Sequence, residues 1–252
     1  MFAGVRDAFV EGEAGHAGAS LAARLLHARA LTHGRLVLTT SFGLEDQLLT
    51  HAAVESGCAL DVVTLDTGRL FDEVYELWAE TERRYGIRIK PFTPDPRSLE
   101  PLVARIGING FRDSIENRRA CCRVRKVEPL DRALAGAAGW ISGLRAGQSS
   151  ARAAVPFLAH DAERDLLRIN PLFDWTREQV ADAVRRDGIP YNRLHDAGMP
   201  SVGCQPCTRA ILPGEDERAG RWWWEQDGSR ECGLHVGRDG RLVRAAARED
   251  AA

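Results

Sequence analysis

Short β-prone segments alternate with helical segments over the first half of the chain. Residues 36–40 and 60–65 are β-prone, and each run is followed by helical spacing, over 47–56 and 71–85. A third β-prone run covers residues 87–92. Strands that alternate with helices form a parallel sheet with helices on both faces. The sequence therefore predicts an α/β fold, with a parallel-type sheet flanked by helices.

Three segments are expected along the chain. Residues 1–34 are predicted to form a helical segment in which Ser20 is the N-cap of the helix. Residues 35–212 are predicted to form the α/β domain, including a long helix over 113–134. Residues 213–252 contain several glycines, which are conformationally permissive, and are predicted to form a mobile C-terminal arm.

Polar turns follow the first two predicted strands. Ser41 and Gly43 stand between a strand and a helix, where backbone N–H groups and a helix N-terminus can bind an anion. Asp66 and Thr67 follow the second strand, at the edge of the sheet where ligands bind in folds of this kind. An ordinary turn is the alternative at each place, and the GxxxxGK[ST] pattern is absent. Two such turns together favour a nucleotide site.

Four cysteines form a CC…CxxC set, Cys121, Cys122, Cys204 and Cys207. Adjacent cysteines are poor disulfide partners, and on a helix their side chains point about 100° apart. A zinc site normally uses paired CxxC motifs, and a dithiol site would use only Cys204 and Cys207. A [4Fe–4S] cluster uses all four thiolates and ranks first, ahead of zinc and the dithiol. Cys58 is expected to be a buried, unreactive residue.

The sixth cysteine, Cys232, stands alone in the sequence Glu231-Cys232-Gly233-Leu234-His235. Arg230 and Arg238 flank this segment, and nearby positive charge favours the reactive thiolate. An idle surface cysteine is the alternative. Arg145 and Arg152, in and after the turn near residue 145, are candidate anion contacts, although exposed arginines are usually only solvated.

Charge and hydropathy exclude several classes of function. The chain has 252 residues, 34 basic and 36 acidic, with a formal net charge of −2, which argues against nucleic-acid binding and a polybasic membrane anchor. No segment approaches the roughly 18 apolar residues of a membrane span. The acidic N-terminus lacks the features of a secretory signal. A cytoplasmic location is therefore expected, where six cysteines indicate metal binding or catalysis.

Six motifs resemble those of the assimilatory sulfonucleotide reductases, in the family's order over residues 36–236. They are Ser41-Phe-Gly-Leu-Glu-Asp46, Leu65-Asp-Thr-Gly68, Cys121-Cys-Arg-Val-Arg-Lys126, Gly143-Leu-Arg145, Cys204-Gln-Pro-Cys207 and Glu231-Cys-Gly-Leu-His235. The CC…CxxC set resembles the iron–sulfur branch, which reduces adenosine 5′-phosphosulfate (APS). The branch specific for the 3′-phosphorylated form (PAPS) typically lacks these cysteines.

The resemblance implies a fold like the adenine nucleotide alpha-hydrolases, with AMP and sulfite as products and thioredoxin as reductant. It implies that Cys232 is the nucleophile and that the CC…CxxC cysteines bind a [4Fe–4S] cluster. The substrate contacts that it implies are Ser41, Phe42, Gly43, Leu65, Lys126, Arg145, Arg218, Arg221 and His235. The loop after Arg145 departs from the family, which often has a further basic residue and a proline there, and Arg152 is a candidate replacement. A homo-oligomer is plausible from the family alone.

Three other functions stay open. A PAPS reductase would share the fold and the nucleophile. An ATP pyrophosphatase that acts on tRNA usually has an SGGxDS turn, from which the segment from Ser41 to Asp46 differs. A zinc-stabilised interaction module would need no nucleophile.

Overall fold

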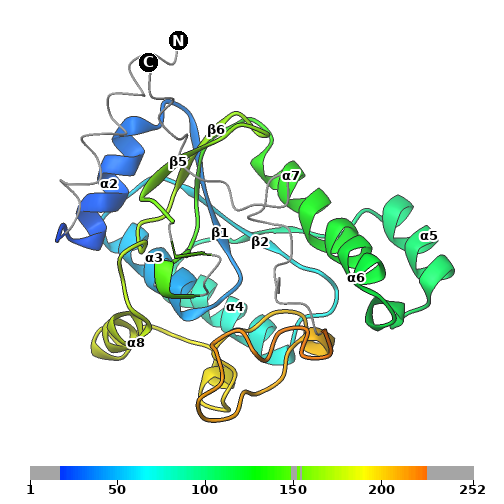
Figure 1. Cartoon of the computed structure of the whole chain (residues 1–252). Helices are drawn as coiled ribbons and strands as arrows, with labels where there is room; N and C mark the ends of the chain where they lie inside the picture. Colours follow the sequence, from blue (N-terminus) through cyan, green and yellow to red (C-terminus); the bar gives the residue numbers. More distant parts are fainter. Residues whose placement is uncertain (1–17, 149–151, 154, 226–252) are drawn as a thin grey trace, which may run out of the picture.

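The computed structural model describes residues 18–148, 152–153 and 155–225. Its described residues form a six-stranded sheet in the order β3-β2-β1-β4-β6-β5 (Figure 1). The strands are β1 (Arg35–Thr40), β2 (Asp61–Leu65), β3 (Lys90–Phe92), β4 (Ala137–Ile141), β5 (Leu158–Asp161) and β6 (Leu166–Ile169). All neighbours pair in parallel except β5, which is antiparallel to β6.

The prediction of a parallel-type sheet is confirmed, with one addition. β5 was not predicted from the sequence; it is a four-residue edge strand joined to β6 by a tight turn in which Asp165 has a φ of 50°. So short a run, with a charged and an imidazole side chain, has no periodicity that would distinguish it from a loop. Its pairing with β6 makes it a strand.

The described helices are α2 (Leu21–Leu31), α3 (Leu44–Glu55), α4 (Asp72–Tyr85), α5 (Pro96–Ile106), α6 (Ile115–Cys122), α7 (Glu128–Leu134) and α8 (Arg177–Arg186). Ser20 is the N-cap of α2, as predicted, and its hydroxyl accepts from the N–H of Ala23. In the described part of the chain, no helix is both long enough and apolar enough to cross a membrane.

The long helix predicted over 113–134 is three segments in the structure. A π-helical segment, η2 (Arg123–Val127), separates α6 from α7. Pro129 lies in the first turn of α7, where its missing N–H costs little. The irregular segment lies instead directly after the two adjacent cysteines, and π-helical turns are often found at functional sites.

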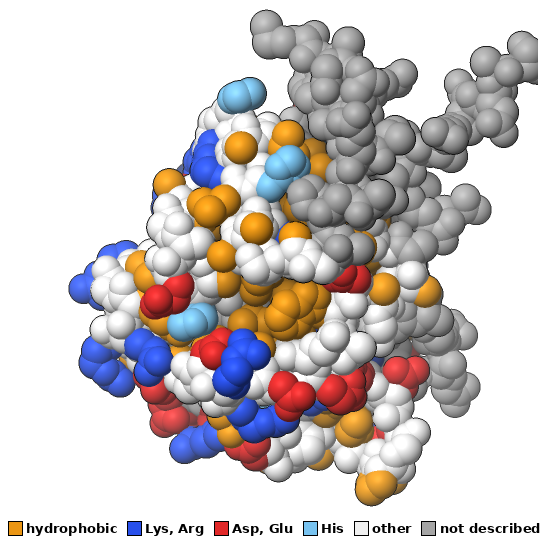
Figure 2. All heavy atoms as spheres, turned by 90° about the vertical axis from the view of Figure 1, so that its left-hand side faces the viewer, with side chains coloured by type: hydrophobic (Ala, Val, Ile, Leu, Met, Phe, Trp, Pro, Cys, Tyr) orange, Lys and Arg blue, Asp and Glu red, His pale blue; other side chains and the backbone are white. Residues whose placement is uncertain are grey.

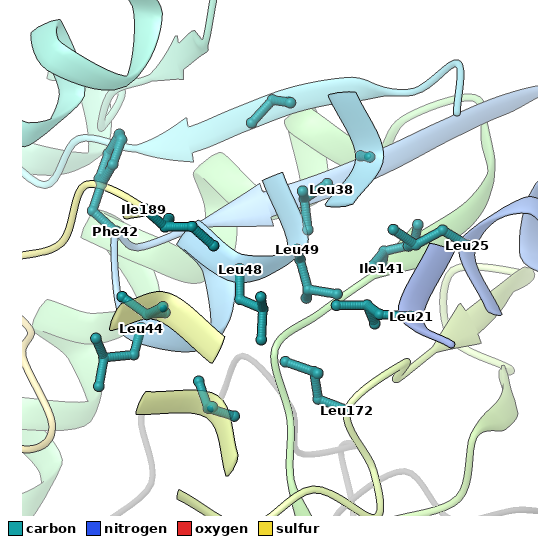
Figure 3. Close-up of a cluster of buried hydrophobic side chains, with 14 of the residues drawn as sticks. Leu21, Leu25, Leu38, Phe42, Leu44, Leu48, Leu49, Ile141, Leu172 and Ile189 are labelled. Atoms are coloured by element: carbon teal, nitrogen blue, oxygen red, sulfur yellow. The ribbon is translucent and has the colours of Figure 1, made fainter. Parts of the chain in front are cut away.

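Two hydrophobic clusters cover the two faces of the sheet. Leu36 and Leu38 of β1 belong to one cluster, and Val37 belongs to the other. Because successive side chains of a strand point to opposite faces, each cluster marks one face. The first cluster includes residues of α2, α3, α4 and α8, and Figure 3 shows Leu49 of α3 below Leu38. The second cluster is completed by residues of α7: Leu130, Ala133 and Leu134.

The described surface on the α2 side of the molecule has mixed charge. Figure 2 shows basic and acidic side chains next to one another, around a smaller hydrophobic area. This mixture agrees with the net charge of −2. On the opposite side of the molecule, α7 lies beside the sheet, and α6 and α5 lie farther from it (Figure 1).

The strand order reverses at the centre of the sheet. β1 pairs with β2 on one side and with β4 on the other, and the chain reaches β4 only after β3. In open α/β sheets, ligands bind outside the carboxyl ends of the strands at such a reversal. Thr40 and Ile141 are the last residues of the two strands and mark this place.

Candidate active site

A cavity of about 210 Å³ opens at the reversal of strand order. Its walls come from the carboxyl ends of β1, β2 and β4, from η2, and from the segment after α8. Seven of the predicted substrate contacts line it, namely Ser41, Phe42, Gly43, Leu65, Lys126, Arg218 and Arg221. We refer to this cavity as the nucleotide cavity.

The turn between β1 and α3 is held in an uncommon conformation. Phe42 is buried and has a φ of 61°, and its N–H donates to the hydroxyl of Thr40. Positive φ is costly for such a bulky residue, and strain of this kind is common at functional sites. Gly43 is the N-cap of α3 and supplies no side-chain cap, so the turn presents the helix N-terminus to the cavity.

Close packing against this turn explains Gly143 in the loop after β4. A Cβ atom at Gly143 would lie 2.7 Å from Oδ1 of Asp46 and 2.8 Å from Cβ of Glu45. Any other residue would push the loop away from α3. The glycine of the Gly143-Leu144-Arg145 motif therefore has a packing role beside the cavity.

Asp46 is a buried carboxyl in the cavity wall. Its Oδ2 accepts from the N–H of Ser41 at 2.6 Å and from the hydroxyl of Ser41 at 2.8 Å. Burial raises the pKa of Asp46 to about 6, and the hydrogen bonds from Ser41 oppose this rise. The raised pKa of Asp46 could not be predicted from the sequence, because the burial of this carboxyl depends on the tertiary fold.

Asp46→Asn is expected to change the pH dependence of stability. The pKa of Asp46 in the folded protein, about 6, exceeds its ordinary value of 3.8, so protonation favours folding. This contribution is complete below pH 3.8 and is lost as the pH rises through about 6. The unfolding free energy of the wild type relative to Asp46→Asn should fall by about 1 kcal/mol from pH 5 to pH 7. Urea unfolding at both pH values measures this difference, and a rise with pH would contradict the assignment.

Four cationic side chains line the nucleotide cavity: Lys126, Arg152, Arg218 and Arg221. Arg221 is buried, and its Nη1 lies 3.3 Å from the carbonyl oxygen of Val202. A Cβ atom at Gly203 would lie 2.1 Å from Nη2 of Arg221, so any other residue there would displace this guanidinium. The cavity wall therefore holds the positive charge that an anionic ligand requires.

Arg145 is not among the described residues that line the nucleotide cavity, and its predicted contact with the substrate stays a prediction. It is 1% exposed, and its guanidinium lies between Glu45 (2.7 Å) and Glu217 (3.1 Å). Both carboxylates come from segments that the fold brings to Arg145, so the sequence could not show the pairing. Arg152, the candidate replacement, does line the cavity.

His195 lines the cavity and was not predicted. Its Nδ1 lies 2.9 Å from the carbonyl oxygen of Met199, and its buried Nε2 has no hydrogen-bond partner in the described part of the chain. Burial lowers the pKa of His195, which favours the neutral ring. The residue stands in a loop without a motif, so the sequence carried no signal for it.

The four cysteines of the CC…CxxC set surround a second, smaller cavity. Cys121 and Cys122 are the last residues of α6, and Cys204 and Cys207 lie at the two ends of the CxxC loop. We refer to this group as the four-thiol site. Lys126, Cys204 and Arg221 line both cavities, so the two sites share a wall.

Hydrogen-bond donors and cations surround the four thiols. The hydroxyl of Thr67 lies 3.3 Å from Sγ of Cys204. Burial raises the pKa of the Cys204 thiol, but Lys126, Thr67 and Arg221 outweigh burial, so the net pKa is lowered. The pKa of Cys207 is raised to about 11, first by burial and then by the nearby Cys204. The surroundings therefore favour thiolate at Cys204.

Buried aromatic and ionic contacts support the four-thiol site. The ring of Trp222 lies 4.8 Å from the guanidinium of Arg118 and 4.7 Å from that of Arg221. Arg118 also forms two hydrogen bonds, of 2.7 and 2.9 Å, with the buried carboxylate of Glu225. Trp222 therefore packs within the site, while Trp223 is 37% exposed.

The four cysteines supply thiol donors of the kind that bind zinc or an iron–sulfur cluster. In the described part of the chain, no group of three or more His, Cys, Asp or Glu side chains is already arranged to hold a metal ion. The four sulfurs instead surround a cavity that is also lined by arginines and a lysine, which suit a bound group of negative charge. Cys232 and His235 lie outside the described residues.

Comparison with known proteins identifies the family. Residues 35–210 match the model of the phosphoadenosine phosphosulfate reductase domain. The chain is 56% identical over 220 residues to an adenosine 5′-phosphosulfate reductase of Agrobacterium fabrum, covering 87% of this chain and 84% of the relative. It is 51% identical over 200 residues to a protein of the same name from Allochromatium vinosum, covering 79% and 78% of the two chains.

Solved structures agree on the fold. A phosphoadenylyl-sulfate (PAPS) reductase from Candida auris, solved as a phosphate complex, superposes with a TM-score of 0.65 at 24% identity, covering 77% of this chain and 91% of that chain. An FMN adenylyltransferase from Candida glabrata superposes with a TM-score of 0.51 at 15% identity, covering 74% and 62% of the two chains. The fold predicted from the resemblance to sulfonucleotide reductases is confirmed. The chain belongs to the phosphoadenosine phosphosulfate reductase domain family.

Proposed function

We propose that this protein reduces adenosine 5′-phosphosulfate to sulfite and AMP, in the assimilation of sulfate. The observation that carries the proposal is the wall shared by the nucleotide cavity and the four-thiol site, made by Lys126, Cys204 and Arg221. Relatives at 44–56% identity are named adenosine 5′-phosphosulfate reductase, which supports this substrate.

The nucleotide cavity suits an adenylyl sulfate. The turn from Ser41 to Gly43 and the N-terminus of α3 would face a phosphate, and Leu65 would lie near the adenosine. Lys126, Arg218 and Arg221 would hold the sulfate and phosphate while an anion attacks. His235 is proposed from its motif to act with them.

In the proposed first step, the thiolate of Cys232 attacks the sulfur of the substrate. A sulfur–sulfur bond forms, the bond from sulfur to the phosphate oxygen breaks, and AMP leaves with the electron pair. The product is an S-sulfocysteine, and this covalent intermediate divides one difficult step into two easier ones.

The second step needs a dithiol reductant, for which we propose thioredoxin. One of its thiolates attacks Sγ of Cys232 and releases sulfite with the electron pair, leaving a mixed disulfide. The second thiol of the reductant then breaks this disulfide and restores Cys232. The dithiol supplies both electrons, and Cys232 must be reached both by substrate and by the reductant, which suits a mobile C-terminal arm.

Cys121, Cys122, Cys204 and Cys207 are proposed to hold a [4Fe–4S] cluster. Such a group would contribute negative charge and local structure beside Lys126, which lines both cavities. A cytoplasmic location, a homo-oligomeric state, and the division into residues 1–34, 35–212 and 213–252 stay predictions.

Turnover of the two sulfonucleotides tests the substrate. We expect the purified enzyme, with thioredoxin, to form sulfite from adenosine 5′-phosphosulfate. Its kcat/KM for this substrate should be at least about tenfold above that for the 3′-phosphorylated form, because the added phosphate must be accommodated in a small cavity. Sulfite release under matched conditions measures both values. Equal or faster turnover of the 3′-phosphorylated substrate would transfer the assignment to PAPS reduction.

A further inference from the structure

A buried guanidinium joins two segments of the chain that meet at the nucleotide cavity. Nε of Arg145 lies 2.7 Å from Oε1 of Glu45, in the first turn of α3. Its Nη2 lies 3.1 Å from Oε2 of Glu217, which directly precedes Arg218. Arg145 therefore ties the nucleotide turn to the segment that carries Arg218 and Arg221.

Gln148 extends this network to a further cation of the cavity. Its Nε2 donates to Oε1 of Glu45 at 3.1 Å, and its Oε1 accepts from Nη1 of Arg152 at 2.6 Å. The backbone N–H of Arg145 also donates to Oε1 of Gln148, at 3.3 Å. The loop after β4 thus uses one amide side chain to place Arg152 relative to α3.

The charges of the network explain why Arg145 is needed. Glu45 and Glu217 line the nucleotide cavity, where their negative charge would repel an anionic ligand. Arg145 contacts both carboxylates, and Arg177 lies 3.9 Å from Glu217. Carboxylates this close to one another and partly buried are stable only when they are paired.

We propose that Arg145 and Glu217 are positioning residues for anion binding. Their ion pair holds the segment of Arg218 and Arg221 against the nucleotide turn and neutralises the carboxylates of the wall, while Arg145 itself does not touch the ligand. The inference rests on the proposed function only for the identity of the anion, the phosphosulfate part of the substrate.

Calorimetric binding of AMP and ADP to the full-length protein with its cluster tests this pair. ADP carries a second phosphate where the substrate carries sulfate, so it is an unreactive probe of the outer anion position. Arg145→Lys and Glu217→Ala should each weaken ADP binding roughly tenfold and AMP binding less, because lysine lacks the fork that bridges two carboxylates. The double variant should be no weaker than Arg145→Lys alone, because the contact with Glu217 is already lost in that variant.

Two further variants separate positioning from a general loss of structure. Glu217→Asp keeps the charge and should recover most of the ADP affinity. Glu215→Ala is the matched control, since Glu215 pairs with Arg209 at 3.0 Å in a partly exposed ion pair two positions away, and it should leave ADP binding unchanged.

Several results would overturn the inference. Additive losses in the double variant would mean that Arg145 and Glu217 act independently and not as a pair. Equal losses for AMP and ADP would mean a structural role alone, and unchanged ADP binding in both single variants would mean no role. Failure of the wild type to bind either nucleotide would instead refute the proposed function itself, so the two failures are distinguishable.

Discussion

Replacing Cys232 by serine is expected to abolish sulfite formation. A hydroxyl at this position is almost never ionised at neutral pH, so the covalent step loses its nucleophile. Loss of a nucleophile commonly lowers kcat by a factor on the order of 10⁴ or more. Sulfite release with adenosine 5′-phosphosulfate, thioredoxin and thioredoxin reductase measures the effect.

The same variant should retain substrate binding. The residues that line the nucleotide cavity, Ser41 to Gly43 and the cations around them, are unchanged by the substitution. Cys58→Ser is the matched control, because Cys58 is a buried thiol of the large apolar cluster and has no proposed role in the reaction. Normal sulfite formation by the Cys232→Ser protein would refute the proposed mechanism.

Replacing Cys204 by serine is expected to remove most of the iron from the purified protein. Cys204 lines both cavities and is the cysteine whose surroundings favour thiolate, through Lys126, Thr67 and Arg221. Serine is a poor ligand for iron in such clusters, so the remaining three cysteines would hold the cluster weakly. Iron and acid-labile sulfide, measured after anaerobic purification, report the loss.

Cys58→Ser again provides the comparison, because the Cys58 thiol lies 3.5 Å from the carbonyl oxygen of Leu25, within the large apolar cluster and not at the four-thiol site. Its iron content should equal that of the wild type. A colourless wild-type protein that contains zinc would contradict the cluster. Full iron content in Cys204→Ser would show that Cys204 is not a ligand.

The parts of the fold that the sequence predicted are those with local signals. Ser20 determines the start of α2 through a hydrogen bond within three residues, as predicted. The β-prone character of residues 36–40 is also local, and these residues lie in β1. β5 was not predicted, because a run of four residues is too short to show the periodicity that identifies a strand.

The residues of the candidate site also divide into those with a local sequence signal and those whose position depends on tertiary contacts. Ser41 to Gly43 were predicted to lie by the ligand because the end of a parallel strand has a known place in such a sheet, and they line the cavity. Arg145 was predicted from its motif to contact the substrate, but the direction of its side chain depends on Glu45 and Glu217. These residues lie 100 and 72 positions away in the sequence. His195 has no local signal, because only tertiary packing buries its ring.

The most direct test of the proposed function is a single turnover without reductant. The purified protein, with its iron content determined, is mixed with adenosine 5′-phosphosulfate, and released AMP is quantified while the peptide that carries Cys232 is examined by mass spectrometry. The account predicts AMP in an amount equal to the active protein, and one SO₃ group on Cys232. Absence of AMP release from iron-loaded protein, or AMP release without modification of Cys232, would contradict it.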